Sequence, residues 1–155
     1  MKLFLVLDNV RSVHNVGTIF RTADAVGVEK IFCVGITPTP IDRFGRKRRD
    51  FAKSALGSEE TVAWESTNDG AELLLRLKKE GSQIVVLEQS LQAVHYTKLS
   101  SKELPTVLVV GNEVEGVSPE MLALADIVAD IPMKGQKESL NVAVATGIAL
   151  YRFLE

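Results

Sequence analysis

Short apolar runs alternate along this chain with segments whose apolar residues recur at helical spacing. The short runs cover residues 3–7, 30–35, 84–88, 106–111 and 127–132 and are rich in Val, Ile, Leu and Phe. Runs of this length with consecutive apolar positions are typical of strands that are covered on both faces of a parallel sheet. The pattern therefore predicts five strands buried in the middle of the protein.

Three helices are expected between these strands. The first ends at Gly27, a residue that favours a helix stop, and its apolar positions are Val16, Ile19, Phe20, Ala23 and Val26. The second covers residues 71–79, and the third covers residues 118–125, where Ser, Pro and Glu in succession favour a helix start. Alternating strands and helices predict an α/β fold with a mostly parallel sheet.

The last segment, residues 140–154, is apolar on nearly every side of a helix. Its small residues, among them Ala145 and Gly147, allow another backbone to approach closely. A helix that is apolar all round must be covered all round. The pattern leaves two covers open: a second copy of the protein, or the chain's own sheet and a loop.

Composition limits the class of protein. The chain has 155 residues, of which 46% are hydrophobic and 25% charged, so a single domain with a substantial core is expected and disorder is excluded. The single cysteine, Cys33, excludes an internal disulfide and favours a reducing compartment, so we expect a cytoplasmic location. The separation of His14 from His95 predicts no zinc site, and no apolar stretch approaches the ~20 residues of a membrane span.

The net charge of −2 conceals a strongly basic segment. Residues 43–53 contain six basic residues and one acidic residue and carry +5, whereas the rest of the chain carries −7. Two prolines and a glycine in residues 37–50 predict a long exposed loop around this basic segment. The total charge argues against a nucleic-acid partner, but its distribution does not.

Familiar phosphate-binding motifs are absent. The chain contains no G-x-G-x-x-G, which argues against a dinucleotide site. Residues 111–116 have the glycine spacing of a P-loop, but Val117 stands where that motif requires lysine, and Glu113 and Glu115 would repel phosphate. The loop favours a ligand with a cationic part, or one without phosphate.

Three further segments carry candidate chemistry. Each also has a purely local explanation. In the first, Asn15 would cap a helix and Arg21 would pair with Asp24. The second, residues 108–118, would be a strand followed by a turn, and the third would hold a helix cap at Ser139 or Asn141. The motif residues of the three segments are Asn15, Gly17, Arg21 and Ala23; Gly111, Glu113 and Gly116; and Ile131, Pro132, Met133, Ser139, Leu140 and Asn141.

In this order and spacing, the segments resemble the three motifs of the SpoU-type (TrmH-like) RNA methyltransferases of the SPOUT superfamily. The resemblance covers residues 5–152. It implies a Rossmann-like sheet whose C-terminal part forms a deep trefoil knot, and a homodimer formed through the last helix. We expect residues 1–155 to be a single SpoU-type methyltransferase domain with no appended RNA-binding domain.

The resemblance also implies a cofactor and a reaction. S-adenosylmethionine would be held by Leu87, Gly111, Ile131, Met133 and Leu140, with Gly111 allowing its backbone to approach the ligand closely, and no metal is expected. The methyl group would pass to a ribose 2′-hydroxyl of structured RNA, either tRNA or rRNA. The implied catalytic residues are Arg21, Asn15, Glu113, Ser139 and Asn141. The implied RNA-binding residues are Arg43, Arg46, Lys47, Arg48, Arg49 and Lys53.

Several alternatives stay open at this point. Arg21 is the general base proposed for similar enzymes, with Asn15 and Glu113 orienting it, but a guanidinium stays protonated in proteins. Two physically safer roles therefore remain: stabilising the developing alkoxide, or relaying its proton through an RNA phosphate. A SPOUT-type base methyltransferase and a non-catalytic RNA-binding module are the alternative functions.

Overall fold

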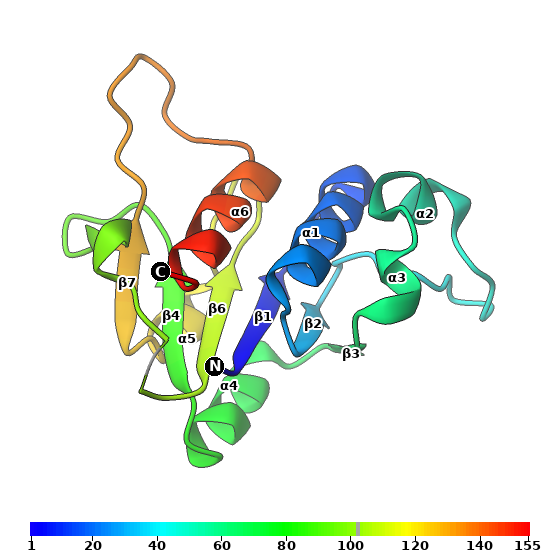
Figure 1. The fold of residues 1–155 in the computed structure, drawn as a ribbon, viewed down its shortest axis with the longest axis horizontal. Helices are drawn as coiled ribbons and strands as arrows, with labels where there is room; N and C mark the ends of the chain where they lie inside the picture. Colours follow the sequence, from blue (N-terminus) through cyan, green and yellow to red (C-terminus); the bar gives the residue numbers. More distant parts are fainter. Residues whose placement is uncertain (102) are drawn as a thin grey trace.

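In the computed structural model, which describes residues 1–101 and 103–155, seven strands form one sheet (Figure 1). Their order is β3-β2-β1-β6-β4-β7-β5, and each neighbouring pair is parallel. The strands are β1 (Leu3–Asp8), β2 (Lys30–Val34), β3 (Trp64–Thr67), β4 (Gln83–Leu87), β5 (Val94–His95), β6 (Thr106–Val110) and β7 (Ile127–Asp130). The α/β fold class and the five expected strands are confirmed.

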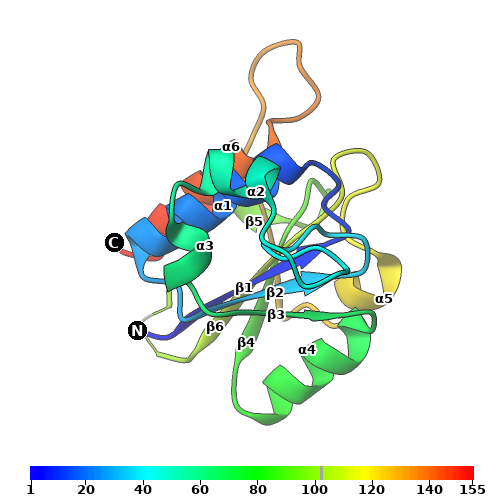
Figure 2. The same ribbon diagram turned by 90° about the vertical axis from the view of Figure 1, so that its right-hand side faces the viewer.

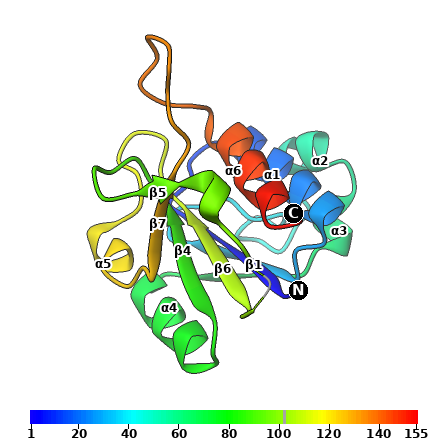
Figure 3. The same cartoon turned by 60° about the vertical axis from the view of Figure 1, so that its left-hand side comes forward.

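Helices cover both faces of the sheet (Figures 2 and 3). One face carries α1 (Val13–Val26), α2 (Arg49–Ala55), α3 (Ser58–Thr61) and α6 (Val142–Arg152), and the other carries α4 (Gly70–Lys79) and α5 (Pro119–Leu122). A short 3₁₀ helix, η1 (Tyr96–Lys98), follows β5. Each face has its own apolar core because side chains alternate along β1: Leu5 and Leu7 face α1, whereas Val6 faces α4.

Cys33 lies in the core of the α1 face, as its strand pattern predicts. Burial disfavours the thiolate and raises the pKa of the Cys33 thiol to about 12. A thiol in this environment stays protonated and unreactive near neutral pH.

The start of α1 differs from the local expectation. Ser12, and not Asn15, is the N-cap, and its hydroxyl accepts a hydrogen bond from the Asn15 amide at 3.1 Å. The helix begins earlier because Val13 packs against the core and belongs to its first turn. Gly27 ends the helix in a left-handed conformation, as predicted. Asp24 accepts a hydrogen bond from Thr61 instead of pairing with Arg21.

Five short elements were not predicted: β3, β5, α2, α3 and η1. The β3 sequence, Trp-Glu-Ser-Thr, lacks an apolar run because this strand lies at the sheet edge, and β5 has only two residues. The expected loop at residues 37–50 ends where α2 begins at Arg49 and contains a bridge between Ile41 and Lys47. The helix α5 ends at Leu122, earlier than expected, and residues 123–125 continue as hydrogen-bonded turns.

Gly17 sets how closely α1 approaches α2. A methyl group at this position would overlap the Ser54 hydroxyl and would lie 2.9 Å from the Phe51 carbonyl oxygen. On the same interface, the rings of Phe20 and Phe51 meet edge to face with centroids 5.0 Å apart. Any side chain at position 17 would therefore push the two helices apart.

We expect Gly17→Ala to lower the free energy of unfolding by about 1–3 kcal/mol, the usual cost of overpacking a core. Denaturant titration followed by circular dichroism measures this change. Gly135→Ala is the matched control, because a methyl group there has no neighbour within 4 Å and should change stability by less than about 0.5 kcal/mol. Equal stability of the two variants would contradict the packing argument.

Candidate functional site at the carboxyl ends of the central strands

A cavity of about 340 Å³ lies where three adjacent strands, β6, β4 and β7, end. Carboxyl ends of parallel strands are the usual position of ligand sites in open α/β sheets, and this volume suits a small organic ligand. Three loops contribute to its lining: the residues after β4, the residues after β6, and the long loop of residues 131–141 that leads to α6. That loop extends well away from the sheet (Figure 1).

All five residues expected to hold a cofactor line this cavity: Leu87, Gly111, Ile131, Met133 and Leu140. Two of the expected catalytic residues, Glu113 and Ser139, line it as well. These residues come from segments up to 53 positions apart in the sequence, and the sheet order brings them together. The site therefore assembles from three loops, two of which carry the second and third motifs.

The lining is acidic. Glu88, Glu113, Asp130 and Glu138 border the cavity, whereas its lining in the described part of the chain includes neither lysine nor arginine. The remaining lining is largely apolar, with Leu87, Val110, Ile131, Met133, Leu140 and Val142. Carboxylates beside apolar side chains favour a ligand that combines a positive charge with a flat or aliphatic body.

The loop of residues 111–118, called the β6 loop below, has an ordered shape of its own. Asn112 and Gly116 exchange two backbone hydrogen bonds of 3.0 and 2.9 Å across it. A methyl group on Gly111 would overlap the backbone of Gly116 and Val117. Packing within the loop thus requires glycine at position 111, in addition to the close approach to a ligand expected from the sequence.

Two carboxylates from neighbouring strands bind the amides at the end of the β6 loop. Asp8, at the end of β1, accepts from the Ser118 amide at 2.7 Å, and Glu88, directly after β4, accepts from the Val117 amide at 2.7 Å. These two residues were absent from the predicted site. The signal that could have found them is an acidic residue immediately after each apolar run, at the edge where parallel strands end.

Glu113 joins the β6 loop to the start of α1. Its carboxylate accepts hydrogen bonds from the Arg11 amide at 3.2 Å and the Ser12 amide at 3.3 Å. Within one chain it therefore positions the first turn of α1 and makes no hydrogen bond to Arg21 among the described residues. This contact links the cavity wall to the helix that carries the first motif.

Asn15 and Asn141 also meet, although 126 positions separate them in the sequence. The Asn141 side-chain amide donates to the Asn15 side-chain oxygen at 3.2 Å. Asn141 is also the N-cap of α6, where its oxygen accepts from the Ala143 amide at 2.8 Å. Of the two caps left open by the sequence, the structure thus selects Asn141. The first and third motifs are therefore in contact beside the cavity.

Arg21 is the one expected catalytic residue that a single chain does not bring to the cavity. It lies exposed on α1, is absent from the cavity lining, and makes no hydrogen bond or ion pair with another described residue. It lies six positions after Asn15 on the helix, so the two side chains leave the helix in different directions. Any role for Arg21 at this site requires a group from outside the chain.

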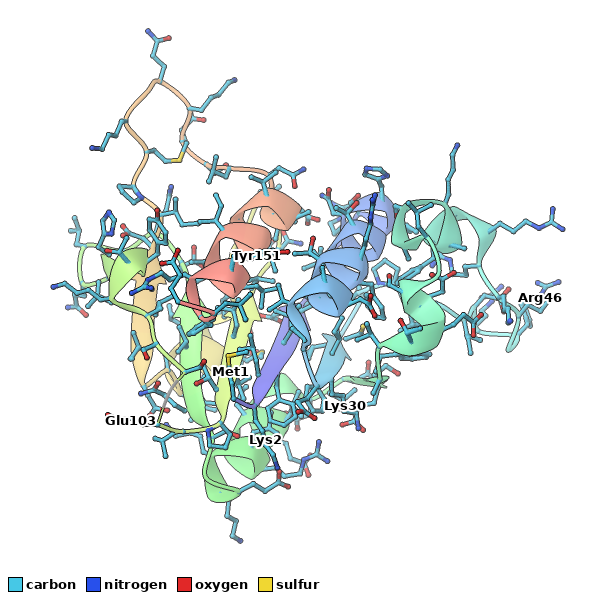
Figure 4. The ribbon with its side chains drawn as sticks, in the orientation of Figure 1. Met1, Lys2, Lys30, Arg46, Glu103 and Tyr151 are labelled. Carbon is cyan, nitrogen blue, oxygen red and sulfur yellow. The ribbon has the colours of Figure 1, made fainter. Side chains whose placement is uncertain are left out.

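The basic segment lies far from the cavity, beyond the opposite edge of the sheet, with Arg46 at its outer end (Figure 4). Three of its cations are paired with carboxylates: Arg46 with Asp42, Lys47 with Glu60 and Arg48 with Asp50. The hydrogen bond from Lys47 to Glu60 raises the pKa of that lysine. Within the described chain, the cations without a carboxylate partner are Arg43, Arg49 and Lys53.

The SpoU rRNA Methylase family matches residues 2–151. This chain belongs to that family. The tRNA (guanosine(18)-2′-O)-methyltransferase of Aquifex aeolicus is 40% identical over 149 residues, which are 96% of this chain and 67% of the relative. The 23S rRNA (guanosine-2′-O-)-methyltransferase RlmB of Pseudomonas aeruginosa is 34% identical over 152 residues, which are 98% of this chain and 58% of the relative.

A solved structure has the same fold as this SpoU family member. The AdoMet-bound rRNA methyltransferase from Sinorhizobium meliloti superposes with a TM-score of 0.87 and 34% identity, covering 97% of this chain and 55% of that protein. Several of the curated relatives are thus considerably longer than the segment they share with this chain.

Two further observations concern the described residues of this SpoU domain. No helix within residues 1–101 and 103–155 combines the length and the apolar character needed to cross a membrane. No three His, Cys, Asp or Glu side chains in the same ranges are grouped so that they would hold a metal ion.

We expect Glu88→Ala to lower the free energy of unfolding by about 1–3 kcal/mol, because it leaves the Val117 amide without its acceptor. Glu88→Gln keeps a carbonyl oxygen at this position and should lose less. Glu115→Ala, which removes an exposed carboxylate of the same loop, is the matched control. Thermal or denaturant unfolding distinguishes them, and equal effects of Glu88→Ala and Glu115→Ala would refute the role of Glu88.

Proposed function

We propose that this protein is an S-adenosylmethionine-dependent RNA methyltransferase that modifies a ribose 2′-hydroxyl of tRNA or rRNA. The observation that carries the proposal is the acidic, apolar-lined cavity, which is lined by residues of the second and third family motifs and lies beside the start of the first. The relatives support the reaction class, since the two described above are named as guanosine 2′-O-methyltransferases of tRNA and of 23S rRNA.

The cavity lining fits the proposed cofactor. Leu87, Ile131, Met133 and Leu140 offer apolar contacts for an adenine ring, and Glu88 and Asp130 offer negative charge for an ammonium or sulfonium group. The cofactor, when bound, supplies an electrophilic methyl group on a positively charged sulfur. A solved relative from Sinorhizobium meliloti, described as AdoMet-bound, supports this assignment.

The protein must then position a hydroxyl and accommodate its proton. The Asn15–Asn141 contact and Ser139 lie beside the cavity and provide hydrogen-bonding groups for a ribose. A hydroxyl becomes a competent nucleophile as its proton departs, so a nearby positive charge lowers the barrier by stabilising the developing alkoxide. We assign this electrostatic role to Arg21, because a guanidinium stays protonated at ordinary pH and cannot accept the hydroxyl proton, which would pass to an RNA phosphate and from there to solvent.

We propose that Arg21 reaches the reacting groups from a second copy of the chain, in a homodimer formed through α6. Val144 and Tyr151 lie on the outer side of α6 with about half of their surface exposed, and Tyr151 is visible there in Figure 4. Packing within the chain does not require glycine at position 147, since a methyl group there would make only an ordinary 3.7 Å contact with Thr22. These features support a cover from outside the chain.

A C-terminal trefoil knot and a cytoplasmic location complete the proposal. The knot is supported by contacts between the segment around η1 and the end of α6: Arg152 donates to the Thr97 carbonyl, and Ser101 donates to the Phe153 carbonyl. These bonds place residues 97–101 against the last helix. The cytoplasmic location rests only on cysteine usage and stays a prediction.

We expect Val144→Glu to shift the protein from dimer to monomer, because a carboxylate buried in an apolar interface is unfavourable. Light scattering coupled to size exclusion at micromolar concentration measures the mass. Leu75→Glu is the control, since Leu75 is similarly exposed but lies on α4 across the sheet. A monomeric wild-type protein in this experiment would contradict the proposed dimer and the role of Arg21 that depends on it.

We expect Arg21→Ala to slow methyl transfer at least about 100-fold, because the charge that stabilises the developing alkoxide is lost. Cofactor affinity should stay unchanged, because Arg21 does not line the cavity. Calorimetric titration with S-adenosylmethionine measures the affinity, and transfer of labelled methyl groups to tRNA measures turnover. A collapse of cofactor binding in this variant would instead mean that Arg21 is structural.

One experiment tests the function as a whole. Unfractionated tRNA and ribosomal RNA are incubated with the protein and labelled S-adenosylmethionine, and the RNA is then digested to nucleosides. A 2′-O-methylated nucleoside supports the proposal, whereas a methylated base identifies the base methyltransferase. Binding of RNA without any methyl transfer identifies the non-catalytic module.

A further inference from the structure

The tip of the basic segment is a small ordered hairpin, residues 41–47. Ile41 and Lys47 form an antiparallel bridge at its base. Inside it, one carboxylate oxygen of Asp42 accepts from the Phe44 amide at 2.8 Å and from the Arg46 amide at 2.9 Å, while the other accepts from the Arg46 side chain at 3.2 Å. These bonds hold the pKa of Asp42 below its usual value and keep the turn in one shape.

At the end of this hairpin, Phe44 is 66% exposed. The guanidinium groups of Arg43 and Arg46 lie 4.8 and 5.1 Å from the centre of its ring. The hairpin's internal hydrogen bonds do not need this side chain, because they involve the backbone amide of residue 44. An aromatic ring is therefore presented to the surroundings on a pre-shaped support, with two guanidinium groups close to it.

We propose that Phe44 stacks on an unpaired base of the RNA while Arg43 and Arg46 bind the adjoining phosphates; this inference rests on the proposed function. A flat ring beside guanidinium groups matches a nucleotide, which pairs a flat base with an anionic phosphate. The concentration of positive charge in residues 43–53 favours a polyanion over an apolar protein surface as the partner. Phe44 is thus an RNA-recognition residue outside the three motifs.

The position of the hairpin gives this contact a distinct role. It extends beyond the β3 edge of the sheet, whereas the cavity lies at the ends of β6, β4 and β7 (Figure 1). A base held there is a second anchor, separate from the nucleotide at the reaction site. It favours RNA with an unpaired base near the target over a continuous double helix, in which every base is stacked internally.

The first test compares Phe44→Ala and Phe44→Trp with Leu75→Ala, which truncates a similarly exposed apolar residue on the other face of the sheet. Affinity for unfractionated tRNA is measured over a series of salt concentrations. Phe44→Ala should bind about 5- to 150-fold more weakly, and Phe44→Trp and Leu75→Ala should bind like wild type. The slope of log affinity against log salt should not change in Phe44→Ala, because no phosphate contact is lost.

The second test uses RNA hairpins with 2-aminopurine at each loop position in turn. Stacking on Phe44 should change the fluorescence at one or two positions, and Phe44→Ala should abolish that change. Wild-type affinity of Phe44→Ala, or a fluorescence change that persists without the ring, overturns the inference. A changed mass of Phe44→Ala in light scattering also overturns it, by identifying Phe44 as a contact between copies of the chain.

These outcomes separate the inference from the proposed function. If the wild-type protein methylates tRNA but Phe44→Ala binds equally well, only the stacking contact is wrong. If the wild-type protein neither binds nor methylates RNA, the proposed function fails and the inference fails with it.

Discussion

The hydrogen bonding of the β6 loop is the constraint on which the rest of the site depends. In the sheet, β6 lies between β1 and β4, and an acidic residue at the end of each neighbour, Asp8 and Glu88, binds an amide of that loop. Charge-assisted hydrogen bonds of this length are stronger than those between neutral groups. The loop is therefore anchored from both sides, and it gives the cavity a defined wall before any ligand binds.

The β6 loop also positions the starts of the two helices beside the cavity, α1 and α6. Glu113 binds the amides at the start of α1, and α1 in turn brings Asn15 to Asn141 at the start of α6. Three segments that are distant in sequence thereby become one structural unit around an acidic cavity. Arg21 does not line the cavity in a single chain, which is why we propose that it acts from a second copy.

Much of this arrangement could be predicted from residue order. The five buried strands follow from consecutive apolar positions, and the residues expected to hold a cofactor, Leu87, Gly111, Ile131, Met133 and Leu140, line one cavity. The predictions that failed depend on tertiary contacts. A polar edge strand such as β3 has no apolar run to reveal it, and the true cap of α1 depends on Val13 reaching the core.

The ion pairs of the basic segment, like the elements that were missed, depend on tertiary contacts. Its excess of positive charge is evident in the sequence, but the pairing of Lys47 with Glu60 appears only when α3 is placed beside the hairpin. Lys47 and Glu60 are both exposed, so exchanging the carboxylate of this pair for another anion costs little. The number of cations free to bind an anion is therefore a property of the fold as well as of the composition.

The sequence by itself determined the α/β class, the succession of its main elements, and the three motifs with the ligand charge that they favour. Apolar periodicity and motif spacing are properties of short stretches of sequence, so they can be recognised without knowing the fold. Only the tertiary structure decided the strand order, the anchoring of the β6 loop and the outward position of Arg21. These depend on hydrogen bonds such as the one between Glu113 and Arg11, 102 positions apart, whose formation depends on how the whole chain packs.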